Sequence, residues 1–161
     1  MAITRASTTA DGTEGNGISG TPSLSEDGTL VAFDTTATNL GFRPDPSGSS
    51  SVFLKNLTTG AITRLSSDSD GNPLTQQSFF ASLAPDGSAV AFVTGAQEVV
   101  GSGRPRQVVV KSLLTGDLRV ASTAADGTLA NADVTTPSLS DDGRTVAFGT
   151  AASNLVPNDA N

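Results

Sequence analysis

Apolar residues along the chain come in short runs, and turn-forming dipeptides separate these runs about every ten residues. β-Branched side chains are common in the runs, and no stretch has the spacing of a long amphipathic helix. The pattern therefore predicts an all-β protein. Its first complete set of segments predicts four short strands, at residues 21–25, 29–36, 51–57 and 61–67.

The sequence repeats itself at a period of 56–59 residues. Residues 22–33 (PSLSEDGTLVAF) return as residues 81–92 (ASLAPDGSAVAF) and again as residues 137–148 (PSLSDDGRTVAF). Further along, residues 52–60 return as residues 108–116. Repeats of this length indicate one structural unit that stacks on copies of itself.

Each repeat is expected to form an up-and-down sheet of four antiparallel strands. An Asp-Gly turn joins the first two strands and a Thr-Gly turn joins the last two, and both links are short enough for hairpins. Such a sheet has two faces to bury, so the copies must stack face to face. The sequence therefore predicts β-propeller blades, in about two and three-quarter repeats.

The predicted organisation is a single β-propeller segment over residues 1–161. It divides into an outer strand and linker (1–20), a first repeat (21–78), a second repeat (79–134) and a partial third repeat (135–161). The outer strand is expected near residues 2–8, which match the last strand of a repeat. Because closed propellers use about four to eight blades, we expect either a longer chain or a homo-oligomer, most simply a dimer.

Three aligned phenylalanines are the predicted core. Phe33, Phe92 and Phe148 end the Val-Ala-Phe segment of each repeat. We expect them at equivalent buried positions between sheets. The valines two residues earlier should share their face, because alternate residues of a strand point the same way. These valines are Val31, Val90 and Val146.

The Pro-Ser-Leu-Ser-x-Asp-Gly core, followed by Val-Ala-Phe and by the Val-Phe-Leu-Lys and Thr-Gly segments, resembles the WD40-like bacterial β-propeller repeats of the TolB type. The resemblance covers essentially the whole chain. It implies an interaction scaffold in a periplasmic or extracellular bacterial protein. The repeat differs from WD40 proteins proper because it lacks Trp and exceeds their usual length of about 40–45 residues.

Composition narrows the classes of partner. The formal net charge is −7, from 16 acidic and 9 basic residues, and six aspartates directly precede a glycine. Much of the acidity is therefore expected to be turn chemistry. So few basic and aromatic residues argue against nucleic acid as a partner. No apolar stretch approaches the roughly 18 residues of a spanning helix, so membrane insertion is not expected.

No catalytic residue can be assigned. The chain has no Cys, His or Tyr, which removes thiol nucleophiles, Ser-His pairs and the usual neutral-pH base. The adjacent carboxylates Asp141 and Asp142 align with turn residues of the other repeats, which favours a structural role. We therefore expect no enzyme and no cofactor. The first hypothesis is a non-enzymatic interaction or structural module; the alternative is the propeller portion of a larger hydrolase that gates or positions substrate.

Binding is expected at the end of the sheets that carries the long connections, because recognition commonly lies on loops held by a rigid scaffold. The candidate contacts for a protein or glycan partner are Arg43, Asp45, Arg104 and Arg106. A separate candidate is a weak calcium site at Asp68, Asp70 and Asn72. Its loop has oxygen ligands at alternate positions, but Phe79 stands where an EF-hand has its last glutamate, so a plain turn is favoured.

Overall fold

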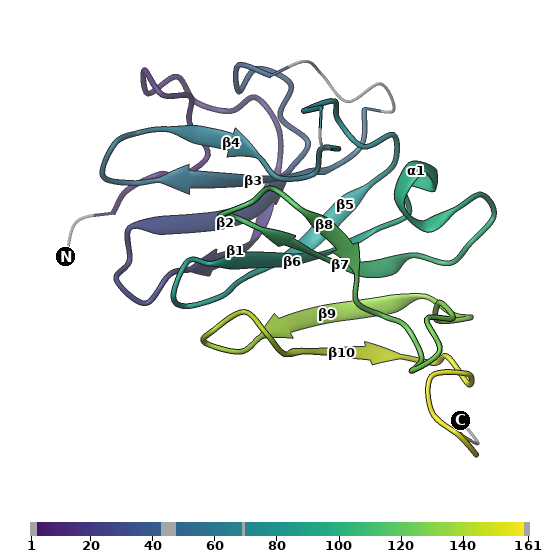
Figure 1. The fold of residues 1–161 in the computed structure, drawn as a ribbon. Helices are drawn as coiled ribbons and strands as arrows, with labels where there is room; N and C mark the ends of the chain where they lie inside the picture. Colours follow the sequence, from purple (N-terminus) through teal and green to yellow (C-terminus); the bar gives the residue numbers. More distant parts are fainter. Residues whose placement is uncertain (1–2, 43–47, 69, 160–161) are drawn as a thin grey trace.

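The computed structural model describes residues 3–42, 48–68 and 70–159 (Figure 1). Its first sheet, blade 1, contains β1 (Ser19–Leu24), β2 (Leu30–Thr35), β3 (Ser51–Asn56) and β4 (Ile62–Arg64). Blade 2 contains β5 (Ser78–Leu83), β6 (Ala89–Thr94), β7 (Gln107–Ser112) and β8 (Leu118–Val120), with the one-turn helix α1 (Gln97–Val100) between β6 and β7. Blade 3 contains β9 (Val134–Leu139) and β10 (Val146–Thr150).

The strands of each blade are antiparallel and follow one another in chain order. The repeats keep their register: Val31 pairs with Lys55 across β2 and β3, and Val90 pairs with Lys111 across β6 and β7. Figure 1 shows the three sheets following one another along the molecule. The predicted all-β fold, built from four-stranded antiparallel sheets, is confirmed.

The outer strand predicted near residues 2–8 is wrong for the part of it that the structure describes. Residues 3–7 form no strand, and the side chain of Ile3 is fully exposed. Only an isolated bridge between Thr8 and Glu14 remains, like those that follow β4 and β8. A last strand of a blade needs the preceding strand as its hydrogen-bonding partner, and the described residues before position 19 contain no such strand.

Three hydrophobic clusters hold the sheets together. Phe92 and Val90 lie between blades 1 and 2, where Phe92 is 0% exposed. Phe92 is therefore buried between sheets as predicted. Phe33 is buried with Val31, as predicted, but between blade 1 and the amino-terminal segment, which forms no sheet in its described residues. Phe148 packs against the cluster between blades 2 and 3 but is only partly buried. It differs because the described part of blade 3 has two strands instead of four.

Two buried lysines, one in blade 1 and one in blade 2, each link a blade to the segment that precedes it. Lys111 Nζ donates to the carbonyl oxygens of Leu65 (3.1 Å) and Ser67 (2.9 Å) and to Ser67 Oγ (2.9 Å). The aligned Lys55 donates to the carbonyls of Thr8, Thr9 and Gly60. Burial lowers the pKa of both lysines, and a nearby aspartate opposes that shift in each case. Each ammonium therefore donates to several backbone carbonyls of the segment that precedes its blade, including those of Leu65 and Thr9, which also accept a bond from a backbone N–H.

The aspartates of the Asp-Gly turns hydrogen bond locally, as the sequence predicted. Asp27 accepts hydrogen bonds from Ser25 Oγ (2.6 Å) and the Thr29 N–H (2.9 Å), and Gly28 beside it has a φ of 69°. These bonds lower the pKa of Asp27, and equivalent bonds, led by the Thr9 hydroxyl, lower the pKa of Asp11 to about 2. Acidity in this chain is thus largely a feature of its turns.

The first strand of each blade contains a repeated backbone irregularity. Thr21, Phe80 and Thr136 occupy aligned positions and have φ values of 40°, 57° and 44°. Each lies where the register of the first two strands of its blade shifts. A left-handed φ is costly for residues with a Cβ, so its recurrence marks a bulge that the fold imposes on all three blades.

Among the described residues no helix is long and apolar enough to cross a membrane.

Candidate functional site

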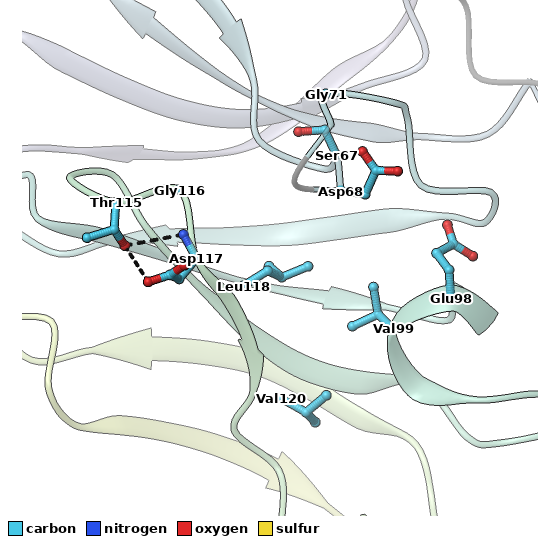
Figure 2. Close-up of a pocket in the computed structure, with 10 residues that line it drawn as sticks. All are labelled: Ser67, Asp68, Gly71, Glu98, Val99, Thr115, Gly116, Asp117, Leu118 and Val120. Atoms are coloured by element: carbon cyan, nitrogen blue, oxygen red, sulfur yellow. Dashed lines mark hydrogen bonds between the residues drawn. The ribbon is translucent and has the colours of Figure 1, made fainter.

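A hollow of about 900 Å³ lies between blades 1 and 2; we call it the inter-blade pocket (Figure 2). Four short segments meet there: the connection after β4, helix α1, the β7–β8 turn and strand β8. Both neighbouring blades have all four strands in the structure. The residues that line the pocket are Ser67, Asp68, Gly71, Glu98, Val99, Thr115, Gly116, Asp117, Leu118 and Val120.

Local backbone structure brings these side chains together. Alternation along β8 turns Leu118 and Val120 towards the pocket, while Arg119 lines a separate hollow beside blade 3. Helix α1 carries Glu98 and Val99 and ends at Gly101, whose φ of 87° reverses the chain. In the view of Figure 2, Leu118 and Val99 lie between Asp117 on one side and Glu98 on the other. The pocket therefore has an aliphatic part with carboxylates beside it.

Hydrogen bonds engage two of these carboxylates, Asp68 and Asp117. Asp68 accepts bonds from the side-chain amide of Asn72 (3.1 Å) and from the N–H groups of Asn72 (2.8 Å) and Asp70 (3.0 Å), which lower its pKa. Asp117 accepts a bond from Thr115 Oγ1 (2.8 Å). The bonds to Asp68 favour the ionised form of that carboxylate.

Glu98 is anchored by the connection after β4. It accepts hydrogen bonds from the Thr75 N–H (2.6 Å) and Thr75 Oγ1 (2.7 Å). Burial raises the pKa of Glu98, as does the negative charge of Asp68, but the bonds from Thr75 outweigh both effects and the net pKa is lowered. The negative charge of Asp68 therefore acts on the carboxylate of Glu98 across the pocket.

Around blade 1, the region equivalent to the inter-blade pocket is filled by side chains of the protein. Arg64 is 7% exposed, and its guanidinium carbon lies 5.2 Å from the ring centre of Phe53 and 5.7 Å from that of Phe42. The two rings are 5.5 Å apart. These three bulky side chains close the space between blade 1 and the segment before it.

Blade 2 has a smaller residue at each of these positions. The repeat alignment places Gly101, Val109 and Val120 where blade 1 has Phe42, Phe53 and Arg64. The alignment of the loop is supported by the bonds that Asn39 and Glu98 both make to aligned partners, Asn16 and Thr75.

At one aligned position the residue beside blade 2 is larger. Leu74 is almost fully buried and takes the place of Gly15, the residue one repeat earlier, so it fills part of the space. The remainder stays open as the inter-blade pocket. It is therefore a feature of blade 2 that blade 1 lacks.

Comparison with known proteins identifies the fold. No protein-family model matches the chain, and no curated protein matches it. The crystal structure of TolB from Acinetobacter baumannii matches with a TM-score of 0.54 and 21% sequence identity, over 88% of this chain and 28% of that chain. The β-propeller domain of the Trilobed protease from Pyrococcus furiosus matches with a TM-score of 0.53 and 17% identity, over 84% of this chain and 35% of that chain.

The chain has the fold of a TolB-type β-propeller. The resemblance inferred from the sequence is confirmed at the level of the fold. The chain spans about a third of the length of these two structures. At these identities the similarity shows the fold alone, so the function of the chain must be argued from its own residues.

Two of the four sequence-predicted contact residues, Arg43 and Asp45, fall outside the described residues. The other two, Arg104 and Arg106, are not among the residues that line the inter-blade pocket. Arg104 is exposed in the connection before β7. Arg106 Nη2 lies 2.7 Å from Asp133 Oδ2, and its guanidinium lies 5.4 Å from the ring centre of Phe79. Arg106 thus holds two parts of the propeller together, although its side chain is 45% exposed.

The possible calcium loop is organised as a turn in its described residues. The Asp68 carboxylate is already engaged by Asp70 and Asn72, and the Asp68 N–H donates to the Asn72 carbonyl (3.0 Å). Within the described ranges, no three carboxylates gather in a way that could hold a metal ion. Asp68 belongs instead to the wall of the inter-blade pocket. Only a comparison of aligned positions in the two repeats, such as Arg64 of β4 with Val120 of β8, could have predicted that pocket.

Proposed function

We propose that this TolB-type propeller is a non-enzymatic interaction module whose inter-blade pocket holds part of a protein partner. The observation that carries the proposal is the loss of three bulky side chains in blade 2 at positions where blade 1 is filled. Aliphatic surface with a few polar groups beside it is the usual make-up of a binding pocket. The sequence resemblance further supports a periplasmic or extracellular location.

The edge of blade 2 offers a second element of recognition. Strand β8 pairs with β7 on one side and is the last strand in its sheet. The N–H and C=O groups on its other side are available to an added strand, as in other proteins that bind extended peptides. Leu118 and Val120 of the same strand line the pocket, so an added segment would lie beside it.

A selection from a displayed library of random peptides tests this function. The wild-type chain is expected to enrich peptides that no longer bind after Val120→Arg, which restores the residue of blade 1 and fills the pocket. Arg119→Gln is the matched control, because this neighbouring side chain faces the other hollow. Peptides that bind Val120→Arg as well as they bind the wild type would contradict the proposed site.

An activity assay tests whether the chain itself is catalytic. The module is expected to show no turnover of generic ester, peptide and glycoside substrates, because no His or Cys is present as a base or thiol nucleophile. Reproducible turnover that a single Asp→Asn change abolishes would contradict the non-enzymatic proposal. The alternative, in which the chain is the propeller portion of a larger hydrolase, would be supported by a hydrolase domain in the parent reading frame.

The open edge of blade 3 supports a further proposal about assembly. Among the described residues β10 pairs only with β9, and Val146 and Phe148 are partly exposed. We propose that a second copy of this chain covers that edge. Light scattering should then give about twice the 16.1 kDa mass of one chain, with the dimer dissociating on dilution. A stable, folded monomer at micromolar concentration would contradict the assembly.

A further inference from the structure

We infer that the occupant of the inter-blade pocket is an arginine side chain, carried by an extended segment of a partner protein. The inference rests on the proposed function and names the ligand chemistry of the same pocket. It rests on three features: an internal arginine in blade 1, the space that its absence leaves in blade 2, and three carboxylates of the pocket whose aligned residues one repeat earlier are uncharged.

Blade 1 shows how this fold accommodates an arginine between blades. Arg64 comes from the outermost strand, β4, and is almost fully buried. Its guanidinium lies over the rings of Phe53 and Phe42, an arrangement in which a planar cation is held by apolar surface. The chain thus supplies its own arginine at this position of the first repeat.

Blade 2 has the corresponding space without the side chain. Val120 takes the place of Arg64 on the outermost strand, and Gly101 takes the place of Phe42. Leu118 and Val99 provide aliphatic surface along which the methylenes of an incoming arginine can lie. An arginine that enters beside β8 would therefore contact apolar surface with its stem and reach the polar wall with its guanidinium.

The charges of the pocket favour a cation. Asp68, Glu98 and Asp117 line it, whereas the residues one repeat earlier, Thr9, Asn39 and Ala61, are all uncharged. The pocket therefore has a valine in place of the internal arginine and three carboxylates at positions that are uncharged around blade 1.

The nearest buried cation is already in use. The ammonium of Lys111 interacts with the charge of Asp68, but its hydrogen bonds go to Leu65 and Ser67. The single positive charge of Lys111 is also smaller than the combined negative charge that the three carboxylates carry when ionised. The local charge is therefore negative and complementary to a guanidinium.

Arginine fits these features better than lysine does. Its guanidinium is planar and less strongly hydrated than an ammonium, so it loses less solvation when it lies against Leu118 and Val99. It also donates in several directions at once, which suits carboxylates such as Glu98 and Asp117 that lie on different sides of the pocket. A partner segment that pairs with β8 would present such a side chain at every second position.

The test is a titration with four capped pentapeptides, Gly-Leu-X-Leu-Gly, in which X is Arg, Lys, Gln or Leu. Isothermal calorimetry on the wild-type chain should give the tightest binding for Arg, with the Gln peptide weaker by about tenfold or more. The Arg affinity should fall as salt is raised, because the carboxylates lie at the surface. Val120→Arg should abolish binding, and Arg119→Gln should leave it unchanged.

A second variant covers the case in which Val120→Arg does not fold. Asp117→Asn changes an exposed side chain and keeps its size, and it should weaken the Arg peptide by about threefold while leaving the Leu peptide unaffected. Equal binding of the Arg and Gln peptides would overturn the inference, as would Arg binding that survives a folded Val120→Arg. If the Leu peptide binds as tightly as the Arg peptide and is lost in Val120→Arg, the arginine inference fails while the proposed function stands.

Discussion

Replacement of Phe92 by alanine is expected to lower the free energy of unfolding by about 3–5 kcal/mol. The side chain is 0% exposed in the cluster between blades 1 and 2, which both have four strands, so the cavity cannot be filled by solvent or by a neighbouring loop. Urea denaturation followed by circular dichroism measures the change.

Phe148→Ala is the matched control for Phe92→Ala. The two residues are aligned, but Phe148 is only partly buried and packs against one cluster from blade 3. Its loss should cost about half as much, because less apolar surface returns to water. Equal losses for the two variants would contradict the difference in burial and, with it, the description of blade 3.

Lys111→Ala should destabilise the chain by about 3 kcal/mol, because it removes the ammonium that links blade 2 to the connection after β4. Lys111 is 8% exposed and makes all three of its Nζ hydrogen bonds to Leu65 and Ser67. Hydrogen bonds from charged groups contribute about 1.5–3 kcal/mol each, and the Ser67 carbonyl, which loses this donor, adds to the loss.

Lys55→Ala separates a general effect of burying lysine from the specific link between blades. Lys55 donates hydrogen bonds to the carbonyls of Thr8 and Thr9, in the half-buried segment that precedes blade 1. Its replacement should release that segment to proteolysis while the denaturation midpoint of the chain changes less than in Lys111→Ala. A larger loss of stability in Lys55→Ala would contradict this division.

The parts of the fold that the sequence predicted are those set by local patterns. The Asp-Gly and Thr-Gly turns close hairpins within about ten residues, and the alternation in Val-Ala-Phe determines which face is buried. The strand expected near residues 2–8 failed for the opposite reason. Its apolar pattern matches a last strand, but a strand also needs a partner, and pairing depends on residues elsewhere in the blade.

Other features leave little trace in any one segment. Helix α1 has a single turn, too short for a periodic pattern to indicate it. The left-handed backbone of Thr21 and Phe80 uses residue types that do not favour it, so the bulge arises from the packing of the blades. The aspartate turns, in contrast, were predictable because side chain and backbone are neighbours in sequence.

The inter-blade pocket could not be predicted from any one segment, because it forms where blade 2 has smaller side chains than blade 1. Exposed loop charges such as Arg104 and Arg106 were the predicted contacts, yet Arg106 interacts with Asp133 and Phe79. The useful signal was a difference between repeats, in which Gly101 and Val120 replace Phe42 and Arg64. Positions where one repeat departs from its neighbours in size or charge are therefore the better guide to function in such a chain.

Whether the inter-blade pocket binds a partner is tested most directly by mapping where a selected peptide binds, using amide chemical shifts of the nitrogen-15-labelled chain. We expect the peptide to shift the amide signals of α1, the β7–β8 turn and β8. These shifts should disappear in Val120→Arg and remain in Arg119→Gln. Shifts confined to other surfaces, or shifts at β8 that persist in Val120→Arg, would show that the pocket between blades 1 and 2 is not the binding site.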